Sequence, residues 1–197
     1  MRGIAYMKII DITRELFSAV VFQDDPSPEA KRIMSISNDE VCNLTTVSMC
    51  VHNATHIDAP FHFIDSGYGV DAIDLEKCYG KALVVECNDD SIDSCFITSK
   101  VPIGVKRLLV KGRATFTADG AEESVKRGMV LVGVENQSVA VAHDCQSAHK
   151  VFLESEVVIL EGLKLDAVGE GEYTLCAFPL KMKDLDGSPC RAVLIQE

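Results

Sequence analysis

The sequence has little positive charge for its length. In 197 residues it has 19 lysines and arginines against 30 aspartates and glutamates, which gives a formal net charge of -11 and a pI near 4.9. No run of lysine and arginine interrupts this balance. Because sequence-independent binding to nucleic acid or to an anionic membrane needs a basic face, we expect neither partner.

Long hydrophobic runs are also missing. The apolar stretches are short, and residues 1–6 lack the hydrophobic segment of a secretory signal. We therefore expect a cytoplasmic protein with no membrane-spanning segment.

Two common motif types are absent as well. The eight cysteines include no C-x-x-C pair, which argues against a zinc ribbon and a thioredoxin motif, and we expect mostly buried, apolar thiols. No glycine-rich phosphate loop follows a predicted strand. A doubly wound nucleotide-binding sheet is therefore not expected.

A strand-rich pattern fills much of the chain. With 47% hydrophobic residues, one substantial core is possible, and we predict a single α/β domain over residues 1–197 with a mixed sheet. Residues 23–29, rich in proline and aspartate, predict a loop. Helices are expected at 121–127, ended by Gly128, and at 147–153. The predicted strands are 8–12, 81–86, 107–110, 129–134, 157–160, 174–177 and 192–195.

Three of the five histidines crowd into one run, from His52 to His62, which reads H-N-A-T-H-I-D-A-P-F-H. Zinc and manganese bind imidazole nitrogen and carboxylate oxygen, and a catalytic site leaves one position open for water. His52, His56 and Asp58 supply such a set. The run therefore points to a metal-assisted hydrolase rather than to ordinary packing.

The backbone of this run is not expected to be helical. Thr55, Ile57 and Pro60 disfavour a regular helix, although a spacing of four between two histidines would suit one. We expect an irregular loop that leaves a strand.

A second candidate pair, His149 and Glu161, lies on the second predicted helix and after an apolar strand. Alone, the pair could be a surface histidine and a solvated strand-end acid. Its interpretation as metal ligands is supported only by the presence of the first cluster. His143 has no evident partner in the sequence, and its role stays open.

These residues carry a resemblance. The pattern H-x-x-T-H-x-D-A-P-x-H is similar to the signature of the cyclase family, metal-dependent hydrolases that include bacterial kynurenine formamidase and isatin hydrolase. Residues 8–13 resemble its opening strand, His149 and Glu161 have its second ligand spacing, and residues 178–181 with 186–192 resemble its C-terminal signature. The resemblance covers nearly the whole chain.

The resemblance implies a role for each site residue. His52, His56 and Asp58 would hold one divalent ion, zinc or manganese, and Asp58 would bridge to a second ion held by His149 and Glu161. His62 would be the general acid and base that protonates the leaving nitrogen after a metal-activated water attacks.

The resemblance also implies a swivelling β/β/α fold and a homo-oligomer, a dimer or tetramer, whose partner chain helps to wall the active site. The expected substrate is a small molecule, either an aryl formamide such as N-formylkynurenine or a cyclic amide or lactone. A dehydratase or cyclase reaction on a small polyol or amide, and a non-catalytic metal-binding protein, are the alternatives.

Three departures from the family pattern bear on the site. Ala54 stands where the family usually has glycine, so the loop between the first two ligands could differ. Glu135 replaces the common aspartate, and is either a pocket residue or a plain strand-end acid. The chain has no tryptophan for the aromatic wall of kynurenine formamidases, and Phe22 is the nearest candidate.

Overall fold

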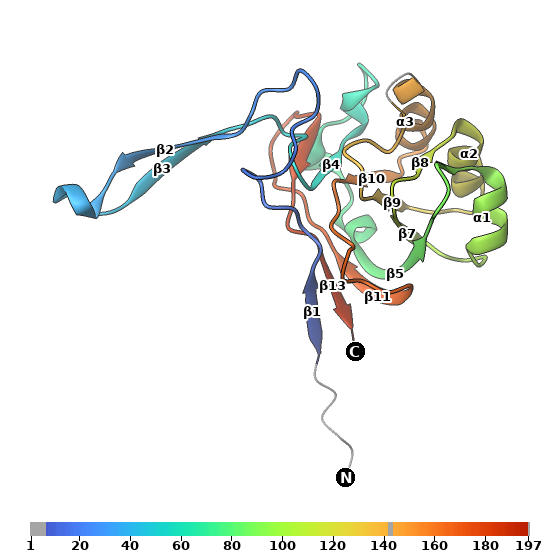
Figure 1. Ribbon diagram of the computed structural model, residues 1–197. Coiled ribbons are helices and arrows are strands. Elements are labelled where there is room, and N and C mark those ends of the chain that lie inside the picture. The colour runs from blue at the N-terminus through green and yellow to red at the C-terminus, as the bar shows by residue number, and fades with distance from the viewer. Residues whose placement is uncertain (1–6, 142–143, 197) are drawn as a thin grey trace, which may run out of the picture.

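The computed structural model describes residues 7–141 and 144–196, and within these residues one mixed sheet of nine strands organises the chain (Figure 1). Its strand order is β1-β13-β11-β5-β7-β9-β10-β4-β12. In chain order these strands are β1 (Lys8–Asp11), β4 (His56–Asp58), β5 (Tyr79–Glu86), β7 (Arg107–Lys111), β9 (Leu131–Val134), β10 (Val158–Glu161), β11 (Gly171–Cys176), β12 (Gly187–Pro189) and β13 (Val193–Gln196). The predicted α/β class with a mixed sheet is confirmed.

The middle of the sheet is parallel. Strands β5, β7, β9 and β10 pair in parallel, and every residue of β9 and β10 is buried. Strands covered on both faces appear in the sequence as nearly continuous aliphatic runs. The central strands show such runs, which explains why the sequence predicts them. Alternate residues of one strand enter different cores: Val85 packs beneath the helices, whereas Val84 faces the core on the opposite side.

Three α-helices of the described chain lie together on one side of the sheet (Figure 1). They are α1 (Ser94–Lys100), α2 (Ala118–Lys126) and α3 (Cys145–Glu154). The Asp93 side chain caps α1 by accepting a hydrogen bond from Phe96 N at 2.7 Å. Gly128, at φ +73°, ends α2 as predicted, and its N–H donates to Val125 O.

All seven predicted strands and both predicted helices are present, displaced by at most a few residues at their ends. Helix α1 and the short strands β4 and β12 were not predicted, and neither were the strands at Glu29–Met34, Leu44–Ser48, Ser91–Ile92 and Thr115–Phe116. The expectation of an irregular loop over the histidine run is only partly right. The chain does turn irregularly after His52, but His56 and Asp58 lie on strand β4, and a 3-10 turn (Pro60–His62) follows.

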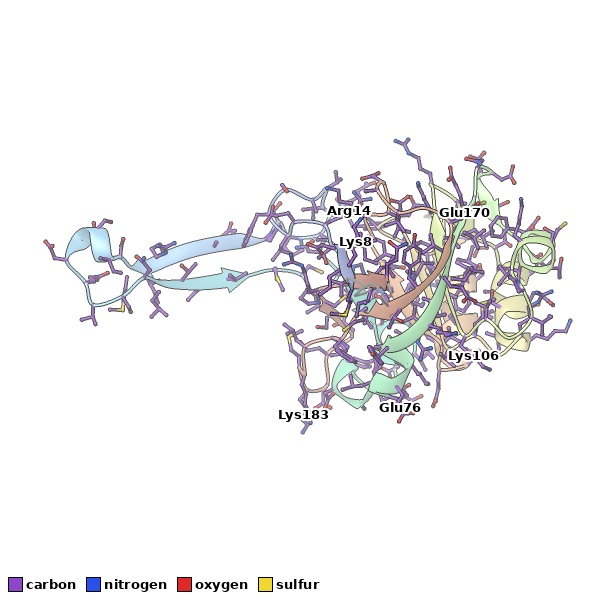
Figure 2. The ribbon with its side chains drawn as sticks, turned by 90° about the horizontal axis from the view of Figure 1, so that it is seen from below. Lys8, Arg14, Glu76, Lys106, Glu170 and Lys183 are labelled. Carbon is purple, nitrogen blue, oxygen red and sulfur yellow. The ribbon has the colours of Figure 1, made fainter. Side chains whose placement is uncertain are left out.

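One part of the chain projects away from the rest. Strands β2 (Glu29–Met34) and β3 (Leu44–Ser48), with the 3-10 turn Ile36–Asn38 between them, form a two-stranded antiparallel sheet of their own. We call residues 29–48 the hairpin arm. Figure 1 shows it extending from the body, and Figure 2 shows its side chains pointing outward. Ten of the eleven residues in its two strands are exposed.

The remaining regular elements are short: β6 (Ser91–Ile92), β8 (Thr115–Phe116) and 3-10 turns at Val70–Ala72 and Leu75–Cys78. The thiol prediction is partly wrong, because Cys42 and Cys95 are exposed while Cys78, Cys87 and Cys190 are buried. Among the described helices, none has the length and apolar character needed to cross a membrane. His143 lies outside the described residues.

Candidate metal centre and active-site cavity

The pairing of three strands brings the predicted ligands together. Strand β4 lies between β10 and β12, and His56 is directly opposite Glu161 in the β4–β10 register. His56 and Asp58 are two residues apart on β4, so their side chains point to the same face of the sheet. Helix α3 supplies His149. All five predicted metal ligands converge at this point.

The distances within the cluster are short. His52 Nδ1 lies 2.9 Å from Asp58 Oδ1. His56 Nε2 lies 3.3 Å from Asp58 Oδ1 and 3.2 Å from Glu161 Oε2. His149 Nε2 lies 3.2 Å from Glu161 Oε1 and 3.6 Å from Asp58 Oδ2. Two sets of ligand atoms share Asp58, one with His52 and His56 and one with His149 and Glu161. A third, less buried group joins His52 with His62 and Asp186.

Burial gives the cluster unusual electrostatics. Asp58 and Glu161 are 1% and 3% exposed. Burial by itself would raise the pKa of Asp58, but its hydrogen bond with His52 and its close contact with His56 outweigh burial and hold that pKa well below its usual range. Burial would likewise lower the pKa of His56, yet its contacts with Asp58 and Glu161 raise it to about 10. The two carboxylates therefore need a cation beside them.

Two atoms of the cluster fit that cation. His56 Nε2 and Asp58 Oδ2 are buried and make no hydrogen bond within the described chain. The other ring nitrogen of His56, Nδ1, donates to Ala54 O at 3.1 Å, which leaves Nε2 as the atom facing the cluster. Buried polar atoms without partners are rare in proteins, and a divalent ion would satisfy both.

The loop around the first ligands is held by its neighbours. Thr55 Oγ1 donates to Gly162 O at 2.6 Å and accepts from Arg14 N, which ties the turn before β4 to the turn after Glu161. Ala54 adopts the left-handed conformation, with φ +57°. This chain thus reaches a backbone geometry typical of glycine while carrying a methyl group, at a cost of about 1 kcal/mol.

His62 stands beside the ligands rather than among the two sets. Its ring stacks on His52, with centroids 4.0 Å apart, and meets Phe63 edge-on at 4.5 Å. Burial lowers the pKa of His62. Its side chain is 28% exposed and faces a cavity of about 370 Å³. A neutral imidazole in this position can accept or donate a proton at a bound molecule.

The cavity contains residues that the sequence interpretation did not assign. Phe22, the predicted aromatic contact, does line it, together with the histidines. The unassigned lining residues are Asp25, Cys50, Phe63, Gln137, Ser138 and Asp186. Only Asp186 carried a signal, because it begins the C-terminal segment 186–192. The others come from irregular segments at residues 25, 50, 63 and 137–138 and have no local pattern.

Glu135, the other predicted substrate contact, does not line this cavity. Its carboxylate accepts hydrogen bonds from Gly112 N at 2.8 Å and from Leu165 N at 2.7 Å. The strand-end interpretation therefore describes Glu135 better, although its role is specific: it ties the ends of two loops to strand β9.

The amino-acid sequence is similar to those of known proteins that share one family. The family model described as "Putative cyclase" matches residues 10–109. The chain belongs to this cyclase family. Cyclase-like protein 2 of Oryza sativa subsp. japonica is 37% identical over 186 residues, covering 82% of this chain and 68% of the relative. The kynurenine formamidase of Bacillus mycoides is 32% identical over 200 residues, covering 94% of this chain and 96% of the enzyme.

A solved structure supports the same grouping. The Bacillus stearothermophilus protein described as a "predicted metal-dependent hydrolase" superposes with a TM-score of 0.84 at 26% identity, covering 98% of this chain and all of that chain. The cyclase fold therefore extends over essentially the whole chain.

Replacing Glu135 should separate its two interpretations. We expect Glu135→Ala to lower the free energy of unfolding by about 2 to 3 kcal/mol, because two backbone N–H groups lose a charged acceptor. Urea unfolding measures the change, with the exposed Glu172→Ala as the control, expected within about 0.5 kcal/mol of wild type. Unchanged stability together with weaker substrate binding would restore the pocket interpretation.

Proposed function

We propose that this cyclase-family protein is a metal-dependent hydrolase of a small amide, either an aryl formamide such as N-formylkynurenine or a cyclic amide or lactone. The observation that carries the proposal is the cluster of three histidines and two buried carboxylates at a cavity that also holds His62. The near full-length similarity to a kynurenine formamidase favours the formamide.

The ligand set fits two divalent ions, zinc or manganese. His52, His56 and Asp58 would hold one, and Asp58 would bridge to a second held by His149 and Glu161. Bound there, a divalent ion would polarise the substrate carbonyl and lower the pKa of water. The shared Asp58 and the buried, unpartnered atoms of His56 and Asp58 support this assignment.

His62 would move the protons of the reaction. Its ring borders the cavity, beside the ligands, and its lowered pKa keeps it neutral near pH 7. A neutral imidazole can accept the proton that the attacking water loses and then deliver it to the departing nitrogen.

The cavity walls suit a small, ring-containing molecule. About 370 Å³ is at the lower end of the volume of ligand pockets, and Phe22 and Phe63 give it apolar faces. Phe22 would take the place of the tryptophan that the chain lacks. Because the lining draws on segments from Phe22 to Asp186, we treat residues 1–197 as one functional domain.

The hairpin arm supports a homo-oligomer. A two-stranded hairpin is only marginally stable by itself in water. This arm also exposes Ile33, Ile36, Val41, Leu44 and Val47, with Val41 94% exposed. Apolar side chains gathered on a projecting segment are typical of a protein interface. A second copy of the chain would cover them.

Metal content tests the ligand assignment directly. We expect close to two zinc or manganese ions per wild-type chain purified without chelator, and strong loss of both in Asp58→Ala, because Asp58 belongs to both ligand sets. Elemental mass spectrometry measures the content. The control is Asp184→Asn, which changes an exposed aspartate and should bind as much metal as wild type. Wild-type protein that binds neither metal would favour the non-catalytic alternative.

Turnover of His62→Ala tests the acid and base role. We expect about two to four orders of magnitude slower hydrolysis of N-formylkynurenine or another cleaved amide, with the metal content of wild type. Reaction in ¹⁸O-labelled water should place solvent oxygen in the carboxylate or formate product. Wild-type product free of the label would indicate the dehydratase or cyclase reaction instead.

The mass in solution tests the arm. We expect light scattering to give a multiple of 21.5 kDa for wild type and a shift toward the monomer for the double variant Leu44→Asp/Val47→Asp. The control, Ile103→Asp, alters an apolar residue that is 81% exposed on the body and should keep the wild-type mass. A monomeric wild type would contradict the proposal.

A further inference from the structure

Asp186 places one carboxylate oxygen beside two histidines of different function. Its Oδ2 lies 2.7 Å from His52 Nε2 and 3.7 Å from His62 Nδ1. The first histidine belongs to a proposed ligand set, and the second is the proposed acid and base. Asp186 also forms a third group of possible ligands with His52 and His62, but that group is only partly buried. Each set that shares Asp58 already has three ligand atoms without Asp186, the number that a catalytic zinc takes from the protein.

The ring of His52 is seated by the segment that contains Asp186. Its Nδ1 faces Asp58, and its Nε2 faces Asp186. Gly187 leaves the room that the ring occupies, since a Cβ on this glycine would lie 2.7 Å from His52 Cε1. Asp186 and Gly187 thus define where the ring lies and which nitrogen points into the cluster.

The backbone of Asp186 is fixed by the strand that carries the ligands. Ala59 N donates to Asp186 O at 2.9 Å, and the next residue, Gly187, pairs with Asp58 in the β12–β4 register. On the other side, Val70 N donates to Leu185 O at 2.8 Å. The carboxylate is therefore held in place relative to Asp58, whereas Asp184, two residues earlier, is exposed.

We propose that Asp186 is a positioning residue that orients His52 for metal binding through Nδ1 and contacts His62 at the cavity with the same oxygen. A metal-binding imidazole whose remote N–H donates to a carboxylate has a fixed tautomer and ring orientation. His56 has the equivalent support from Ala54 O. The His62 part of the inference rests on the proposed function, while the His52 part depends on metal binding alone.

Metal affinity tests the His52 part without any substrate. We expect Asp186→Asn to weaken zinc binding by about 10- to 100-fold and Asp186→Ala by at least as much, measured by competition with a chromophoric chelator. Asp184→Asn is the matched control and should bind zinc like wild type. Thermal unfolding of the metal-free proteins should be the same in all four, which separates lost positioning from lost folding. Wild-type affinity in both Asp186 variants would overturn the proposal.

A double-mutant cycle tests the His62 part. At saturating zinc we expect Asp186→Asn to lower kcat at least tenfold with little change in KM, and to have no further effect on kcat in the His62→Ala background. An equal loss of kcat in both backgrounds would show that Asp186 does not act through His62. If the wild type cleaves no amide, the proposed function fails, and the zinc competition still decides the role of Asp186 toward His52.

Discussion

Two carboxylates buried within one cluster constrain everything else about this protein. Removing an ionised carboxylate from water costs several kcal/mol even after the protein relaxes, so neither Asp58 nor Glu161 is tolerable without compensating charge. Three histidine rings supply nitrogen donors around them, and two of the buried ligand atoms still have no hydrogen-bond partner in the described chain. A divalent ion resolves that imbalance, and its binding energy would then stabilise the fold as well as create the site.

The precision of the site comes from strand register. Strand β4 is only three residues long, yet its partners β10 and β12 fix it from both sides. A shift of one residue would turn His56 and Asp58 toward the opposite face and separate them from Glu161. Glycines reinforce the register by allowing close approach, since a Cβ at Gly162 would lie 2.0 Å from Ala54 O. The pairing of the strands therefore sets the positions of His56, Asp58 and Glu161.

The charges around the cavity also depend on the metal. Among the described residues that line it, there is no lysine or arginine, while Asp25 and Asp186 add negative charge outside the proposed ligand sets. With a net charge of -11 on the whole chain, the attraction of an electron-rich carbonyl has to come from bound cations. The same site without metal would present acidic walls to any substrate.

The amino-acid sequence by itself determined the residue chemistry and the local elements. The central parallel strands were predictable because they are buried on both faces and form continuous aliphatic runs, and α2 because Gly128 follows it. The spacing from His52 to His62 identified ligand types before any contact was known. Strands β4 and β12 were missed because three residues carry too little periodicity to be recognised.

Tertiary structure alone decided which distant residues meet. Pairing of β4 with β10 and β12 set His56 against Glu161 and brought Asp186 to His52, and both contacts span more than a hundred residues. It also turned Glu135 away from the cavity and placed Phe22 within it. Such contacts depend on strand order and register, which are long-range properties of the folded chain and leave no local pattern along the sequence.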